Sequence, residues 1–305
     1  MNNRNFFKCL CIILLAFFLF GCSQKTEDDV SKEPEETRQE NISSTTTTAA
    51  SDYEFEELKL TAYRGDNLIY GIMYRPKNAG KKLPTVIFSH GFNNNYHSGS
   101  RYAAYLAYKG YNVYTFDFCG GSEHSESDGS MLDMTVFSEK EDLEAVISMI
   151  RGLDYVDEEN IFLLGSSHGG LVSAITAAEN KDIIKGMVLL YPGFHIPEMM
   201  TAQFGYADEI PETFELSDVT LGRGYAEVMI NYDVYSHIAA YDKDVLILHG
   251  DEDWVVPISY SERALAAYPS AELKVISGSG HGFDWKDYGV AVDYITEYLD
   301  NHLSN

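Results

Sequence analysis

The stretch Ile161-Phe162-Leu163-Leu164-Gly165-Ser166-Ser167-His168-Gly169-Gly170-Leu171 joins an apolar run, a glycine-flanked serine and a helix-forming segment. A strand, a tight turn and a helix form the context of a nucleophile elbow, with Ser167 as the nucleophile. The flanking glycines remove side chains from a sharp chain reversal. The turn would place the Ser167 hydroxyl at a helix N-terminus, where peptide dipoles favour negative charge. An ordinary Gly/Ser loop could carry the same five residues Gly165 to Gly169, so the rest of the chain must decide whether Ser167 is a nucleophile.

Short apolar runs alternate with helical segments along most of the chain. An antiparallel hairpin is expected at 55–62 and 68–74, followed by strands at 85–89, 112–116, 160–164, 186–191, 245–249 and 273–276. Helices are expected at 102–109, 138–151, 171–178, 260–267 and 290–303. Strands that alternate with helices imply parallel pairing with right-handed crossovers. The sequence therefore predicts an α/β fold with an eight-stranded, mostly parallel sheet flanked by helices.

One interval breaks this alternation. The sixth and seventh expected strands are separated by about fifty residues, which is too long for a simple connection in a compact sheet. The interval is rich in aromatic, methionine and acidic residues. We expect a small cap insertion over the strand ends, at about 193–241, within one domain that covers 53–305.

The N-terminal segment has the pattern of a bacterial lipoprotein signal. Arg4 and Lys8 precede an apolar run at 10–20, which ends at Gly21-Cys22. The run is shorter than the roughly 20 residues of a membrane-spanning helix, which favours a signal peptide over 1–21 with cleavage before a lipidated Cys22. An uncleaved anchor or an ordinary secretory signal is the alternative. Each option predicts an extracytoplasmic protein, and the first adds lipid attachment to the bacterial cell membrane.

The next segment and the overall charge limit the possible partners. Residues 22–52 are acidic, rich in serine and threonine and poor in large apolar residues, which predicts a disordered tether. The formal net charge is −25, so nucleic acid and anionic lipid surfaces would be repelled. The sequence does not determine the oligomeric state.

A nucleophilic serine needs a base, and the base needs an acid that holds its tautomer. His281 lies in a Gly-rich loop after the last expected strand, where the base belongs. Asp253 follows the strand at 245–249 and is the expected acid, with Asp251 or Glu252 as the alternative. The order Ser167, Asp253, His281, each after a strand, predicts a catalytic triad.

An oxyanion formed during acyl transfer needs two backbone donors. The N–H of His168, directly after the nucleophile, is one candidate, and the N–H of Phe92 in the loop Ser89-His90-Gly91-Phe92 is the other. We interpret His90 as a structural hydrogen-bonding residue rather than a second base.

Other reactive residues have simpler interpretations. Cys119 is the only cysteine outside the N-terminal segment, so no intrachain disulfide is expected, and no base is paired with it that would make it a nucleophile. His195, His237 and His249 lack the spacing of a zinc motif, so no metal site is expected. The triad needs no cofactor.

The motifs together resemble the α/β-hydrolase superfamily and, within it, the bacterial feruloyl and cinnamoyl esterases. The resemblance covers about 55–303 and is carried by His90-Gly91-Phe92, Asp117-Phe118, Gly165 to Gly170, His249-Gly250 with Asp253, and Gly280-His281-Gly282-Phe283. Two further segments, 133–135 and 216–222, are similar to the esterase subgroup. The resemblance implies that polar cap residues hold a phenolic ring, and by position Tyr225 and Gln203 would do so here.

We therefore expect an extracytoplasmic serine hydrolase that cleaves small carboxylic esters, of the feruloyl or cinnamoyl type by resemblance. A serine aminopeptidase or prolyl oligopeptidase-like peptidase is an alternative, in which Glu198, Asp208 and Glu209 would bind a free amino terminus. A non-catalytic surface binding lipoprotein is an alternative of another class.

Overall fold

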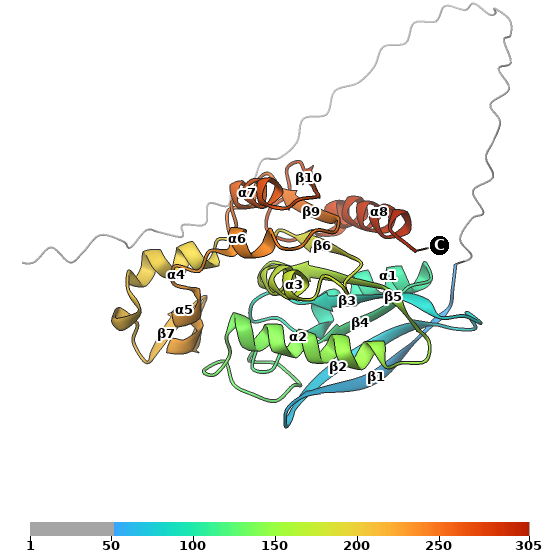
Figure 1. The fold of residues 1–305 in the computed structure, drawn as a ribbon, viewed down its shortest axis with the longest axis horizontal. Helices are drawn as coiled ribbons and strands as arrows, with labels where there is room; N and C mark the ends of the chain where they lie inside the picture. The colour runs from blue at the N-terminus through green and yellow to red at the C-terminus, as the bar shows by residue number, and fades with distance from the viewer. Residues whose placement is uncertain (1–51, 305) are drawn as a thin grey trace, which may run out of the picture. The chain divides into compact units, whose positions relative to one another are not determined.

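The computed structural model describes residues 52–304, so the signal peptide, the proposed lipidation site Cys22 and all but the last residue of the expected tether lie outside the described residues. Eight strands form one sheet in the order β1-β2-β4-β3-β5-β6-β9-β10 (Figure 1). Their bounds are β1 Phe55–Arg64, β2 Asn67–Pro76, β3 Leu83–Ser89, β4 Asn112–Phe116, β5 Val156–Ser166, β6 Gly186–Leu190, β9 Val245–Gly250 and β10 Ala271–Ile276. Within this sheet, only the pairs β1·β2 and β2·β4 are antiparallel. The expected eight-stranded, mostly parallel sheet is confirmed.

Helices cover both faces of this sheet. Their bounds are η1 Tyr96–Gly99, α1 Ser100–Tyr108, α2 Val136–Arg151, α3 His168–Glu179, α7 Ser259–Ala267 and α8 Trp285–Asn301. The apolar residues of α2, α3 and α7 share one buried cluster, and those of α1 and α8 share the other. Strand β5 supplies both clusters because alternate side chains of a strand point to opposite faces: Leu163 faces the first and Phe162 and Leu164 face the second.

Several helices begin earlier than expected, and α2 shows why. The expected start was Ser138, but the helix begins at Val136, because Thr135 and Ser138 form a reciprocal capping box. The Thr135 side chain accepts from the Ser138 N–H, and the Ser138 hydroxyl accepts from the Thr135 N–H, each at 2.9 Å. Two otherwise unpaired backbone donors are thereby satisfied.

The segment between β6 and β9 forms small elements outside the main sheet. They are α4 Ile196–Phe204, η2 Ala207–Glu209, β7 Thr213–Leu216, β8 Val219–Gly222, α5 Arg223–Met229 and α6 Val234–Ile238. Figure 1 shows α4, α5 and β7 together at one end of the domain. The hairpin β7–β8 was not expected from the sequence; it turns at Ser217 and Asp218, which both adopt positive φ. No helix within the described range is long and apolar enough to cross a membrane.

Candidate active site

Ser167 lies in the sharp turn between β5 and α3, with φ 49° and ψ −118°. Positive φ is costly for a residue with a side chain, and such strain clusters at functional sites. The glycines are required by close packing: a Cβ on Gly165 would lie 2.5 Å from the Gly169 carbonyl oxygen, and one on Gly169 would lie 2.3 Å from the carbonyl oxygen of His90. The turn therefore has the geometry of the nucleophile elbow that the sequence predicts.

The structure brings the three predicted triad residues together. The Nε2 atom of His281 lies 2.9 Å from Ser167 Oγ, and its Nδ1 atom lies 2.8 Å from Asp253 Oδ2. Because the Asp253 carboxylate can only accept while it is charged, Nδ1 would carry the proton and Nε2 would face the serine as the base. The arrangement can remove the proton of the Ser167 hydroxyl.

Asp253 is fixed on both of its oxygens. The backbone N–H groups of Val255 and Val256 each donate to Oδ1 at 2.8 Å, and the residue is 6 % exposed. Buried His249 lies 3.2 Å from Oδ2 through its Nε2 atom, and burial lowers the pKa of this histidine. The alternative acids point elsewhere: Asp251 accepts from the Gly278 N–H at 2.6 Å, and Glu252 is exposed.

The two predicted oxyanion donors lie in segments that pack against the serine. A Cβ on Gly91, the residue before Phe92, would lie 3.4 Å from Ser167 Cβ. Within the described part of the chain, no acceptor takes the backbone N–H of Phe92 or of His168. His90 is buried and accepts from the Phe118 N–H at 3.2 Å, while its Nδ1 atom lies 2.8 Å from the Gly91 carbonyl oxygen. It thus fixes the loop that carries Phe92.

A buried polar chain, which the sequence did not reveal, lies directly beneath this turn. The Nε2 atom of His168 is hydrogen-bonded to the Glu139 carboxylate, and its Nδ1 atom lies 3.2 Å from the Tyr225 hydroxyl. Glu139, His168 and Tyr225 are 1 %, 2 % and 1 % exposed. The one available sequence signal was an acidic residue at 139 on the helix face otherwise formed by Val136 and Leu143.

The cap residues predicted to hold a ring are placed differently from one another. Tyr225, on α5, is buried against His168 and stacks on its ring at 5.8 Å, whereas Gln203, on α4, is exposed. The structure does not bring the two together, and a substrate contact for either stays a prediction.

His195, at the start of α4, has an Nδ1 atom with no partner among residues 52–304, and burial lowers its pKa to about 4.

Cys119 and the scattered histidines do not form a second reactive site among the described residues. Cys119 is 3 % exposed, and burial raises the pKa of its thiol to about 12, so it is not a thiolate near neutral pH. Among the described residues, no group of three or more histidine, cysteine, aspartate or glutamate side chains could hold a metal ion.

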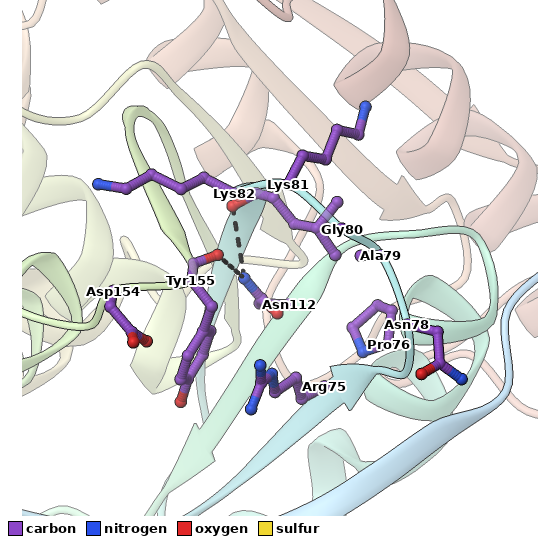
Figure 2. A pocket seen from close by; sticks show the side chains of 11 residues that line it. Arg75, Pro76, Asn78, Ala79, Gly80, Lys81, Lys82, Asn112, Asp154 and Tyr155 are labelled. Carbon is purple, nitrogen blue, oxygen red and sulfur yellow. Dashed lines mark hydrogen bonds between the residues drawn. The ribbon is translucent and has the colours of Figure 1, made fainter.

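A hollow of about 510 Å³ lies at the opposite end of the sheet from Ser167 (Figure 2). It is lined by the end of β2 and the starts of β3 and β4, and includes Arg75, Lys81, Lys82, Asn112 and Tyr155. Figure 2 shows the two lysines pointing away from each other, while the Asn112 amide is hydrogen-bonded to the Tyr155 carbonyl oxygen at 3.3 Å. The hollow is remote from the triad and forms no converging set of donors.

Comparisons with known proteins agree with this fold. The family described as "Serine aminopeptidase, S33" matches residues 80–215. The structure of Est1E from Butyrivibrio proteoclasticus with ferulic acid bound is similar, with a TM-score of 0.73, 27 % identity and coverage of 80 % of this chain and 98 % of that chain. A Mycoplasma pneumoniae protein that carries an esterase/lipase name is 24 % identical over 255 residues, or 74 % of this chain and 92 % of the relative. The proline iminopeptidase of Thermoplasma volcanium is 28 % identical over 56 % of each chain.

Proposed function

We propose that this chain, an α/β-hydrolase by its fold and its relatives, is a serine esterase that cleaves carboxylic esters through an acyl-enzyme. The observation that carries the proposal is the hydrogen-bonded line from Ser167 Oγ through His281 to Asp253. The free backbone donors at Phe92 and His168 support it, because acyl transfer needs stabilisation of an oxyanion.

In this mechanism Ser167 Oγ attacks the ester carbonyl carbon while its proton passes to His281 Nε2. The carbonyl oxygen becomes an oxyanion, which accepts hydrogen bonds from the N–H groups of Phe92 and His168. His281 then gives its proton to the leaving alkoxide as the carbon–oxygen bond breaks. Water attacks the acyl-Ser167 ester with His281 as base, which releases the acid and restores the serine. Asp253 orients His281 throughout and stabilises its positive charge.

The test uses two adjacent serines. Ser167→Ala should lower kcat for p-nitrophenyl acetate by roughly 10⁴-fold or more, because the nucleophile is lost. Ser166→Ala, at the neighbouring and largely buried position, is the matched control and should retain most of the activity. A fluorophosphonate probe should label the wild type and the Ser166→Ala variant but not the Ser167→Ala variant. Near-full activity of Ser167→Ala would refute the triad, and the absence of labelling in all three would favour a non-catalytic binding lipoprotein.

We propose hydroxycinnamate esters as the acyl class. The support is the similarity to a structure with bound ferulic acid and the insertion between β6 and β9. Methyl ferulate should be hydrolysed by the wild type but not by the Ser167→Ala variant. Hydrolysis of the acetate with no measurable hydrolysis of methyl ferulate would exclude this class while leaving the esterase proposal intact.

A peptidase is the second candidate because the matched family is described as a serine aminopeptidase. The geometry gives it less support: Glu198, one of the acids expected to bind an amino terminus, already accepts from Arg263 at 2.6 Å and from the Tyr260 hydroxyl at 2.9 Å. Alanine p-nitroanilide tests this candidate, because its amide bond is far less reactive than a p-nitrophenyl ester. Cleavage of the anilide by the wild type but not by the Ser167→Ala variant would support the peptidase.

We also propose that the mature protein is extracytoplasmic and attached to the membrane through lipid on Cys22. The support is the N-terminal signal pattern and the shift to an acidic tether composition after it. The full-length protein should partition with membranes and incorporate labelled fatty acid, and Cys22→Ala should abolish this incorporation. No incorporation of fatty acid by the wild type would instead indicate an uncleaved anchor or an ordinary secretory signal.

A further inference from the structure

A second hollow, separate from the one in Figure 2, lies directly beside the proposed catalytic base. It has a volume of about 270 Å³ and lies between the start of α1 and the loop that joins β10 to α8. His281 forms part of its wall, together with the rings of Tyr102, Tyr191, Phe283 and Tyr288. At about 30 Å³ for each water molecule, it has room for roughly nine, which is the size of one substituted ring.

The position of the hollow identifies which part of an ester it would receive. The proposed oxyanion donors at Phe92 and His168 fix the carbonyl oxygen, whereas His281 must reach the leaving oxygen in order to protonate it. The group attached to the leaving oxygen therefore lies on the His281 side. Tyr191 packs edge-on against the His281 ring at 4.7 Å and against Phe283 at 5.0 Å, which gives this side an aromatic wall.

The wall of the hollow also carries one arginine, Arg101, in a protein whose net charge is −25. The Arg101 guanidinium lies 3.9 Å from the ring centroid of Tyr288, and among the described residues no carboxylate lies within 4.0 Å of it. Helices α1 and α8 both begin at the hollow, and their N-termini carry partial positive charge. Asp284 is the one acidic residue in the wall. The stacked guanidinium keeps its N–H edges free for a carboxylate.

We propose that this hollow is the alcohol subsite of the esterase and that it takes a ring-bearing alcohol with a carboxylate substituent, which Arg101 binds. The inference rests on the proposed esterase function and adds the chemistry of the leaving group. It assigns leaving-group specificity to α1 and the β10–α8 loop, which lie outside the insertion.

Three acetate esters separate ring binding from charge recognition: ethyl acetate, benzyl acetate and 4-(acetoxymethyl)benzoate. They share one acyl group, and the methylene between ring and oxygen keeps the leaving alcohols similar in basicity. We expect kcat/KM to rise by about fivefold from ethyl to benzyl acetate, because the aromatic wall buries the ring. A further rise is expected for the benzoate.

Arg101→Gln should lower kcat/KM for the benzoate by about tenfold, because a charge-assisted hydrogen bond in a half-open site contributes about that much to binding. The same variant should change kcat/KM for benzyl acetate by less than twofold. The matched control is Arg75→Gln, because Arg75 also stacks on a tyrosine, at 4.1 Å from the Tyr155 ring, but at the other end of the sheet (Figure 2). It should change neither substrate.

The outcomes distinguish the two proposals. If the wild type hydrolyses none of the three acetates and no p-nitrophenyl ester, the esterase function itself is wrong. If it hydrolyses them but does not prefer the ring, or if Arg101→Gln and Arg75→Gln affect the benzoate equally, the esterase stands and the alcohol subsite is refuted. Urea unfolding of both variants checks that they are folded.

Discussion

The buried chain Glu139–His168–Tyr225 makes a sharp prediction, because it connects α2, the turn after Ser167 and α5 through two hydrogen bonds. Glu139→Leu introduces an apolar side chain of similar size and removes the acceptor of the His168 Nε2–H. Both residues are 1–2 % exposed, so water cannot replace the acceptor. Loss of one partner in such a buried pair should lower the free energy of unfolding by about 3 kcal/mol. This lies between the costs of an unsatisfied buried hydrogen bond and of a broken buried ion pair.

A loss of about 3 kcal/mol should lower the unfolding temperature by roughly 6–12 °C for a domain of this size. Glu139→Gln is the matched control, because its amide oxygen can still accept from His168, and we expect it to lose about 1 kcal/mol. Urea titrations followed by circular dichroism measure the free energy of unfolding of both variants. If the free energies of unfolding of Glu139→Leu and the wild type differ by less than about 0.5 kcal/mol, the buried chain contributes nothing to stability.

The same variant tests whether the chain positions the proposed oxyanion donor. The backbone N–H of His168 belongs to the residue whose side chain Glu139 holds, and complete loss of one such donor costs about 3 kcal/mol of transition-state stabilisation. Partial displacement should therefore lower kcat for p-nitrophenyl acetate by about tenfold in Glu139→Leu while KM changes little, and Glu139→Gln should recover most of it. An unchanged kcat in a measurably destabilised Glu139→Leu variant would restrict the chain to a structural role.

Three further predictions concern the core. Burial raises the pKa of Asp142 to about 6. Between about pH 4 and 6 the carboxyl is therefore protonated in the native state but ionised in the unfolded chain. The free energy of unfolding should fall by about 3 kcal/mol as pH rises through that window. Asp142→Asn should flatten this part of the pH–stability curve, and an identical slope in urea midpoints would contradict the assignment. The thiol of Cys119, with its pKa raised to about 12, should resist iodoacetamide at pH 8 in the native protein and react only in urea; rapid native labelling would show that it is accessible. Gly169→Ala should abolish soluble folding or lower stability by more than about 3 kcal/mol, because the new Cβ would lie 2.3 Å from a backbone oxygen; a wild-type melting temperature would show that the turn can relax.

The order of strands and helices could be predicted from the sequence because each element carries a local signal. A run such as Ile161 to Leu164 is too short and too apolar for a surface helix, and its flanking glycines mark the turn that follows. The same local signals placed Ser167, Asp253 and His281 after strands. Since the carboxyl ends of parallel strands meet at one edge of a sheet, the three positions could be expected to converge.

The tertiary structure alone decided the contacts that depend on distant parts of the chain. Asp253 is distinguished from Asp251 by which carboxylate faces His281, and this depends on the path of two loops that begin on neighbouring strands. The pairing of Glu139 with His168 joins two helices, and neither residue carries a sequence signal for the other. The β7–β8 hairpin was also missed, because its strands are only four residues long and the turn uses positive φ at Ser217 and Asp218 rather than at glycine.

The sequence by itself therefore determined the alternation of elements, the serine turn and the order of the predicted triad residues, because hydrophobic period and turn chemistry act over a few neighbouring positions. Only the tertiary structure decided which acid meets His281, what holds His168 from beneath and where a hollow opens beside the base. Those features arise where side chains from separate elements pack against one another, and a buried group such as the Glu139 carboxylate is defined by the partner that satisfies it.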